Sequence, residues 1–217
     1  MPTEKYILPD RAAWLDARKN HIGGSDAAAC VGRSPHKDNV QLWEEKMGLV
    51  LPEDISDKEY VRYGTEAEKY LRGLFALDFP EYQILYDENN MFLNPDFPWM
   101  HASLDGELMD RQGRHGILEI KTTNILQSSQ RRNWEGRIPD NYYCQVLHYL
   151  AVTEYDFVVL KAQLKSEWDG ELHIEVRHYF IERKEVEADI RELLDAEQRF
   201  WDCVVTGRRP DLILPAI

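Results

Sequence analysis

The middle of the chain has the pattern of two strands joined by a turn, and this pair constrains the fold more than any other feature. The segments 99–105 (WMHASLD) and 117–122 (ILEIKT) are short runs rich in apolar residues, a pattern typical of strands. Gly106 and the turn-rich segment 110–116 lie between them. We therefore predict a β-hairpin, which needs further strands or helices to bury its apolar face.

The segments around this hairpin supply such partners. Apolar residues recur at helical spacing from Ser56 to Leu77, and Asp10 is placed to cap a helix that runs through Arg18. Further helices are expected at 26–31 (capped by Ser25 or Asp26), 39–47, 139–152 and 183–205, further strands at 82–86, 91–93, 156–164 and 171–181, and a loop at 50–57. This order predicts one α/β (α+β) domain over residues 1–217, with helices covering a central sheet.

The charge of the chain limits the ways in which it could bind nucleic acid. Asp and Glu number 39 against 26 Lys and Arg, which gives a net charge of −13. A uniformly basic DNA-binding surface is excluded, whereas a local basic groove on an acidic body is not.

Cysteine usage and hydropathy indicate the compartment. Three cysteines (Cys30, Cys144 and Cys203) are too few for a disulfide framework or a four-cysteine zinc or iron–sulfur site. The N-terminal segment lacks the pattern of a signal peptide, and no apolar run approaches the length of about 20 residues that spans a bilayer. We expect a cytoplasmic protein that makes no contact with membranes.

Two carboxylates and a lysine on the predicted hairpin are the strongest candidates for catalysis. Asp105 ends the first strand, and Glu119 and Lys121 point to the same face of the second because side chains alternate along a strand. Together with the carbonyl of Ile120, the two carboxylates would form an oxygen site suited to Mg²⁺ or Mn²⁺. An ordinary amphipathic hairpin with solvated charges would show the same letters, and the spacing alone leaves both interpretations open.

Several motifs in the chain follow one another in an order that resembles a known family. They are HIGGSDAAACVGRSPHKDNVQLWEEKMG (21–48), GTEAE (64–68, similar to a G-x-x-x-E helix motif), SLDGEL (103–108), LEIKTT (118–123) and QVLHY (145–149, a Q-x-x-x-Y motif). This set resembles the lambda exonuclease / YqaJ-like viral recombinase family of the PD-(D/E)xK nucleases. The resemblance implies a restriction-endonuclease-like core, in which helices flank a mixed central β-sheet.

The resemblance also implies roles for the residues of the hairpin. Asp105, Glu119 and the Ile120 carbonyl would hold a divalent metal, expected to be Mg²⁺ with Mn²⁺ as a substitute. Glu66 would reach the same ion from its helix, directly or through water. Lys121 would position or activate the hydrolytic water.

Two further pairs of residues are assigned by the same likeness. Gln145 would bind near the metal or the scissile nucleotide. Tyr149, one helical turn further on the same face, would contact DNA, although a core aromatic residue would fit this position equally well. Arg18 and Ser25 would bind a DNA phosphate, since a serine at a helix N-terminus offers both a hydroxyl and main-chain N–H groups. A helix cap and a surface arginine remain the simpler interpretation of that pair.

The stretch 111–137 is locally basic. It holds six Lys and Arg side chains against two Glu, with Trp134 among them. A mobile basic loop with an aromatic side chain suits a DNA backbone, and we expect Arg131, Arg132 and Arg137 to contact DNA. A solvated loop would give the same composition.

Taken together, the resemblance implies a phage-type alkaline exonuclease that degrades double-stranded DNA from its ends, 5′ to 3′, in a bacterial host cell. The 3′ single strands would serve a single-strand annealing protein, and the enzyme would act as a homotrimer. A PD-(D/E)xK endonuclease or repair nuclease, or a catalytically silent module that binds DNA ends, are the alternatives.

Overall fold

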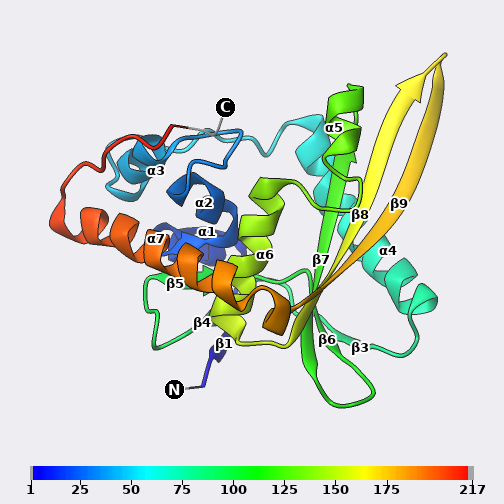
Figure 1. The fold of residues 1–217 in the computed structure, drawn as a ribbon, viewed down its shortest axis with the longest axis horizontal. Coiled ribbons are helices and arrows are strands. Elements are labelled where there is room, and N and C mark those ends of the chain that lie inside the picture. Colours follow the sequence, from blue (N-terminus) through cyan, green and yellow to red (C-terminus); the bar gives the residue numbers. More distant parts are fainter. Residues whose placement is uncertain (1, 215–217) are drawn as a thin grey trace.

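The computed structural model describes residues 2–214, which form two β-sheets with helices between and around them (Figure 1). The smaller sheet has the strand order β1-β4-β5-β2, and the larger one has the order β3-β6-β7-β8-β9. The smaller sheet comprises β1 (Glu4–Ile7), β2 (Ile22–Gly23), β4 (Asn90–Leu93) and β5 (Met100–Ala102). The larger comprises β3 (Gln83–Leu85), β6 (Gly106–Met109), β7 (His115–Asn124), β8 (Phe157–Trp168) and β9 (Glu171–Glu182).

The larger sheet is mixed. Strand β7 pairs antiparallel with β6 on one side and parallel with β8 on the other, and β8 continues into the antiparallel β9. Parallel neighbours need a crossover connection, and here α5 (Ser128–Arg132) and α6 (Asp140–Thr153) supply it. The expected mixed central β-sheet flanked by helices is confirmed.

Helices cover both faces of this sheet because its central strands are apolar on both sides. On one face, Leu118 and Ile120 of β7 pack against Leu71 and Phe75 of α4 (Glu59–Asp78). On the other face, Ile117 and alternate residues of β8 pack against α6. The remaining helices are α1 (Arg11–Lys19), α2 (Gly24–Cys30), α3 (Asn39–Lys46), the short 3-10 helix η1 (Arg183–Glu185) and α7 (Glu187–Thr206).

The predicted hairpin is displaced from its expected position. We expected 99–105 to pair with 117–122, but β5 belongs to the smaller sheet, and the partner of β7 is β6, which begins at Gly106. The chain crosses between the sheets at 103–105, where the side chain of Asn90 hydrogen-bonds both the N–H and the C=O of Leu104. An asparagine side chain thus replaces the main-chain partner of a strand there, and the strand pattern is interrupted.

Smaller differences concern the ends of elements. Helix α2 begins at Gly24, so Ser25 and Asp26 lie in its first turn rather than before it. Pro139 precedes α6 instead of lying in its first turn, and Trp168 ends β8 rather than forming the turn. Strands β1 and β2 and helix α5 were not predicted because they are only two to five residues long.

No helix in the described range 2–214 is both long and apolar enough to cross a bilayer. The helices expected at 39–47 and 56–77 are confirmed as α3 and α4, and Asp10 caps α1 by accepting a hydrogen bond from the Ala13 N–H. The prediction of one domain over residues 1–217 stays a prediction, and residues 1 and 215–217 lie outside the described residues.

Candidate active site

Asp105 and Glu119 lie side by side where β6 begins. Gly106 is paired with Leu118 in the antiparallel register, which places the preceding Asp105 beside Glu119. Glu119 is only 2% exposed. Both residues line one cavity of about 260 Å³. The two carboxylates therefore converge, as the sequence predicted, although Asp105 stands just before a strand rather than at the end of one.

The main chain of Ile120 faces the same place. Its N–H donates a hydrogen bond of 2.8 Å to Oδ2 of Asp105. The N–H and C=O of one strand residue point toward the same neighbouring strand. The Ile120 carbonyl therefore also faces the side of Asp105, which lies just before the first residue of β6. The Ile120 side chain points away, into the core beneath α4.

Lys121 completes the group on β7. Its Nζ lies 2.6 Å from Oε1 of Glu119 and 5.0 Å from the centre of the Tyr142 ring. Burial alone would lower the pKa of Lys121, but the neighbouring Glu119 and Asp105 carboxylates raise it above its ordinary value. The side chain therefore stays a charged ammonium next to the two acids.

Helix α6 presents a glutamine and a tyrosine to the same acids. Gln145 Nε2 donates to Oε1 of Glu119 and to the Tyr149 hydroxyl, at 2.9 Å each. The two residues are four apart on α6, and both are buried. A methyl group at Gly24 would collide with the Tyr149 ring, so glycine at this position lets α2 pack directly on α6.

The electrostatics of the cluster are unbalanced. Burial, followed by the charges of Glu119 and Glu68, raises the pKa of Asp105 well above its ordinary range. Burial also raises the pKa of Glu119, although Lys121 opposes the shift. Three carboxylates thus face one lysine and the nearby Arg72, which is itself paired with Glu68. Two acids crowded in a poorly solvated place favour a bound cation.

The third acid of the cluster is Glu68 and not Glu66. Glu68 lines the cavity with Asp105 and Glu119, whereas Glu66 lines a separate depression on α4 with Tyr63 and Tyr70. Residues two apart on a helix lie on nearly opposite faces. The G-x-x-x-E motif itself would have identified the right residue, because the glutamate four positions after Gly64 is Glu68.

A second, larger cavity of about 560 Å³ opens beside the carboxylates. It shares with the smaller one the residues Thr65, Glu68, Asp105, Gln145 and Tyr149. Arg18 and Ser25 also line it, with the Arg18 Nη2 3.2 Å from the Ser25 Oγ. The predicted phosphate pair and the predicted catalytic group therefore border one continuous hollow.

The walls of this larger cavity carry cations and aromatic rings, and apart from Arg18 the sequence analysis did not identify them. Arg18 lies 4.2 Å from the centre of the Trp14 ring, and Arg72 lies 3.4 Å from that of Tyr86. The additional lining residues of this kind are Arg11 and Lys69. Cations interleaved with aromatic rings suit a nucleic-acid strand, and they come from three separate segments that no local pattern connects.

The basic stretch 111–137 differs from the expected mobile loop. Trp134 is 2% exposed and packs against Tyr142 and Tyr179, so it belongs to the core. Arg131 forms an ion pair of 2.7 Å with Glu175. Of the three arginines proposed to contact DNA, Arg132 and Arg137 are exposed, and none lines either cavity.

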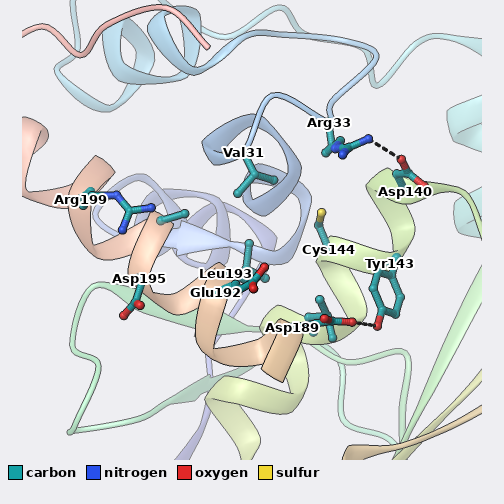
Figure 2. Close-up of a pocket in the computed structure, with 12 residues that line it drawn as sticks. Val31, Arg33, Asp140, Tyr143, Cys144, Asp189, Glu192, Leu193, Asp195 and Arg199 are labelled. Carbon is teal, nitrogen blue, oxygen red and sulfur yellow. Dashed lines mark hydrogen bonds and ion pairs between the residues drawn. The ribbon is translucent and has the colours of Figure 1, made fainter. Parts of the chain in front are cut away.

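Another cavity, of about 670 Å³, lies elsewhere (Figure 2). It lies between α6 and α7 and contains an Arg33–Asp140 ion pair and a Tyr143–Asp189 hydrogen bond. It shares no residue with the carboxylate cavity. Its size alone gives no reason to assign it chemistry, and four of its polar side chains already pair with one another.

The donor atoms at the carboxylates fit a hard divalent cation. Across residues 2–214, no three His, Cys, Asp or Glu side chains are gathered closely enough to enclose an ion by themselves. The donors at hand are the Asp105 and Glu119 carboxylates and the Ile120 carbonyl, all oxygen, which Mg²⁺ and Mn²⁺ prefer. Mg²⁺ in particular usually keeps several waters and takes one or two carboxylates.

Comparison with known proteins identifies the family of the chain. The model of the YqaJ-like viral recombinase domain matches residues 13–156, a span that includes Arg18, Asp105, Glu119 and Gln145. The chain belongs to the YqaJ-like viral recombinase family. The matched span includes every residue that lines the smaller cavity and every residue that the two cavities share, whereas Arg11 of the larger cavity lies just before it.

A relative within this family is the uncharacterized protein YqaJ of Bacillus subtilis (strain 168). The two are 32% identical over 213 residues, which cover 93% of this chain and 59% of that protein. The chain thus spans less than two thirds of the relative's length.

Solved structures show the same fold at low identity. The alkaline exonuclease of Laribacter hongkongensis matches with a TM-score of 0.62 and 16% identity, covering 90% of this chain and 95% of that one. A phage-related exonuclease from Haemophilus somnus 129PT matches with a TM-score of 0.54 and 14% identity, covering 86% and 96%. The family fold is therefore that of these two exonucleases.

Proposed function

We propose that this protein is a divalent-metal-dependent deoxyribonuclease that degrades double-stranded DNA from its ends. The observation that carries the proposal is the convergence of the part-buried Asp105 and the buried Glu119, where carboxylates outnumber cationic side chains, beside a cavity lined by Arg18, Arg72 and Trp14. Family membership supports the same assignment.

The metal would be held by Asp105, Glu119 and the carbonyl of Ile120, with Glu68 beside them. Bound there, Mg²⁺ or Mn²⁺ would supply a Lewis acid for the phosphodiester and lower the pKa of water. The expected ion is Mg²⁺, with Mn²⁺ as a substitute.

The protein's own side chains would position the substrate and its developing charge. The Lys121 ammonium, held by Glu119, lies where it can orient a water and stabilise negative charge on the scissile phosphate. Gln145 fixes the Glu119 carboxylate through a hydrogen bond and is itself fixed by Tyr149. These contacts keep the acid in one orientation before DNA arrives.

Arg18 and Ser25 would hold a terminal phosphate in the larger cavity. A guanidinium and a hydroxyl 3.2 Å apart, next to the N-terminus of α2, suit a phosphate monoester. Holding a 5′ phosphate there would direct digestion 5′ to 3′ and leave 3′ single strands. Action as a homotrimer in a bacterial cell, with a single-strand annealing protein as partner, belongs to the same proposal.

The test uses linear duplex DNA labelled at its ends, with Mg²⁺, and the parent compared with Asp105→Ala. We expect the parent to shorten the 5′-ended strands and the variant to leave them intact. Covalently closed circular DNA is the matched control, and cutting of the circle would assign the protein to the endonucleases instead. Binding of duplex ends without any digestion would make it a silent end-binding module.

A further inference from the structure

The candidate phosphate pair depends on the ends of two short helices. Arg18 lies in the last turn of α1, and Ser25 lies in the first turn of α2. Only the segment 20–23, which includes the two-residue strand β2, connects these helices. The distance between the guanidinium and the hydroxyl is therefore set by whatever fixes this connection.

Lys46, the last residue of α3, contacts the segment that connects α1 and α2. Its Nζ lies 2.8 Å from Oδ2 of Asp26 and donates hydrogen bonds to the carbonyl oxygens of His21, at 2.6 Å, and Arg18, at 3.5 Å. The Arg18 carbonyl also accepts a hydrogen bond of 3.4 Å from the His21 N–H. The main contribution of the ammonium is therefore its short hydrogen bond to the His21 carbonyl, just after the end of α1.

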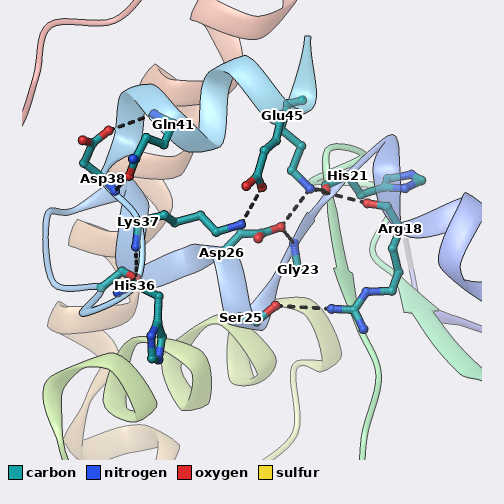
Figure 3. Close-up of polar contacts among 12 residues, drawn as sticks. Arg18, His21, Gly23, Ser25, Asp26, His36, Lys37, Asp38, Gln41 and Glu45 are labelled. Carbon is teal, nitrogen blue, oxygen red and sulfur yellow. Dashed lines mark hydrogen bonds and ion pairs between the residues drawn. The ribbon is translucent and has the colours of Figure 1, made fainter. Parts of the chain in front are cut away.

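Asp26 ties the same ammonium to the start of α2. Its Oδ2 also accepts a hydrogen bond of 3.2 Å from the Gly23 N–H (Figure 3). Burial by itself would raise the pKa of Asp26, but the charge and hydrogen bond of Lys46 hold it below its ordinary value. The Lys46 and Asp26 side chains are only 10% and 15% exposed, so a charged pair is enclosed at this junction.

Neither Lys46 nor Asp26 lines the cavity of about 560 Å³ beside the carboxylates, whereas Arg18 and Ser25 both do. Asp26 and Lys46 belong to the GGSDAA and LWEEKMG segments, and the proposed function gives neither of them a role. Any effect of Lys46 and Asp26 on a bound phosphate therefore passes through the main chain of the two helix ends that carry Arg18 and Ser25.

We infer that the Lys46–Asp26 ion pair is a positioning device that sets the spacing of Arg18 and Ser25 and so determines how strongly the protein distinguishes a 5′-terminal phosphate from a 5′ hydroxyl. The inference rests on the phosphate-binding part of the proposed function.

Lys37 provides a matched control within the same group of charges. Its Nζ forms an ion pair of 2.5 Å with Glu45, and Figure 3 shows it on the α3 side of Asp26. It donates no hydrogen bond to α1. Lys37→Met thus removes one lysine of this network and leaves both helix ends held.

The experiment measures equilibrium binding of two short duplexes by fluorescence anisotropy, with the dye on the 3′ end and EDTA present so that nothing is cut. The duplexes differ only in a 5′ phosphate or a 5′ hydroxyl. We expect the parent and Lys37→Met to prefer the phosphate by about tenfold or more, a difference of roughly 1.4 kcal/mol. For Lys46→Met the preference should fall to within about twofold of none.

Lys46→Met leaves Asp26 as a buried charge without its partner, and this variant could unfold. The double variant Asp26→Asn, Lys46→Met removes both charges and should fold, while the His21 carbonyl loses the hydrogen bond from Lys46. We expect its preference to be lost as well. In an Arg18→Met background, Lys46→Met should cause no further loss, because both changes act on one contact.

A folded double variant that keeps the parent's preference would overturn the inference, and so would an equal loss in Lys37→Met or a parent that binds both ends alike. Failure of the nuclease proposal would look different. In that case the parent would leave DNA intact with Mg²⁺, while the binding preference in EDTA would still respond to Lys46.

Discussion

Helix α6 carries two buried polar clusters on different faces, and they differ in charge balance and access. On one face, Gln145 meets the carboxylates at the cavity. On another face, His148 lies between Glu197 of α7, at 2.8 Å, and the carbonyl of His101, at 2.9 Å. His148 and Glu197 are completely inaccessible to solvent.

The His148 cluster is balanced. The His101 carbonyl can only accept, so Nε2 of His148 donates to it, and Glu197 raises the pKa of the ring, which favours the charged imidazolium. One positive and one negative group thus neutralise each other. The catalytic candidates, in contrast, have more carboxylates than cationic side chains, and they border the larger cavity. Burial of ionisable groups is common to both clusters, and it is the uncompensated charge with access to ligand that marks a candidate for chemistry.

The largest expected difference between the clusters is in activity. Asp105→Asn should lower the rate of nucleotide release from linear duplex DNA by about 100- to 1000-fold or more, because a donor to the cation is lost. Its stability should be equal to that of the parent or higher, since one of two repelling acids is removed. Urea denaturation measures the second quantity, and a parent-like digestion rate would contradict the assignment.

The balanced cluster should respond in the opposite way. Glu197→Ala leaves a buried imidazolium without its partner and should reduce the free energy of unfolding by about 3–5 kcal/mol. The digestion rate per folded molecule should stay within about twofold of the parent's, measured at a temperature where the variant is folded. A large loss of activity in a fully folded Glu197→Ala protein would remove the distinction between the two clusters.

Divalent cations should also separate the clusters. Mg²⁺ at about one hundred times its dissociation constant stabilises a protein by about 2.7 kcal/mol if it binds only the folded state. We expect thermal melting of the parent to shift upward with Mg²⁺, while Glu119→Gln shows little shift. Glu197→Ala, although less stable, should keep the full response.

The smallest expected effect is the dependence of stability on pH. Burial alone would lower the pKa of His148, but Glu197 and the His101 carbonyl raise it above its ordinary value. A raised pKa in the folded state means that the contribution is complete below the unfolded-state pKa and is lost as pH rises through the folded-state value. The stability difference between the parent and His148→Gln should therefore shrink as pH rises from 6 to alkaline values, in a series of urea titrations.

Local patterns predicted much of the site because its central parts are local. Glu119, Ile120 and Lys121 lie on one strand, and alternation fixes their directions. Gln145 and Tyr149 are one helical turn apart. The error at Glu66 has a simple origin in helical geometry, since Glu68 is on the face of Gly64, which packs close to Thr122 of β7.

The sequence could not predict the wall of the larger cavity that we propose to face DNA, for a physical reason. Arg11, Lys69 and Arg72 are brought together only by the packing of α1 and α4 around one hollow. Conversely, a high local density of arginines suggested a DNA track near Trp134. That residue is buried, and Arg131 is instead engaged by Glu175 across the sheet. A cluster of arginines along the sequence therefore does not predict where cationic side chains gather on the folded surface.

The parallel pairing of β7 with β8 has a consequence for assembly. Strand β7 carries Glu119 and Lys121. Its parallel neighbour β8 comes only at residues 157–168 of the chain, after both crossover helices. Such distant pairings form late in folding. A nascent or truncated chain that ends before β8 would therefore hold nearly every side chain of the site in order along the sequence and yet remain inert.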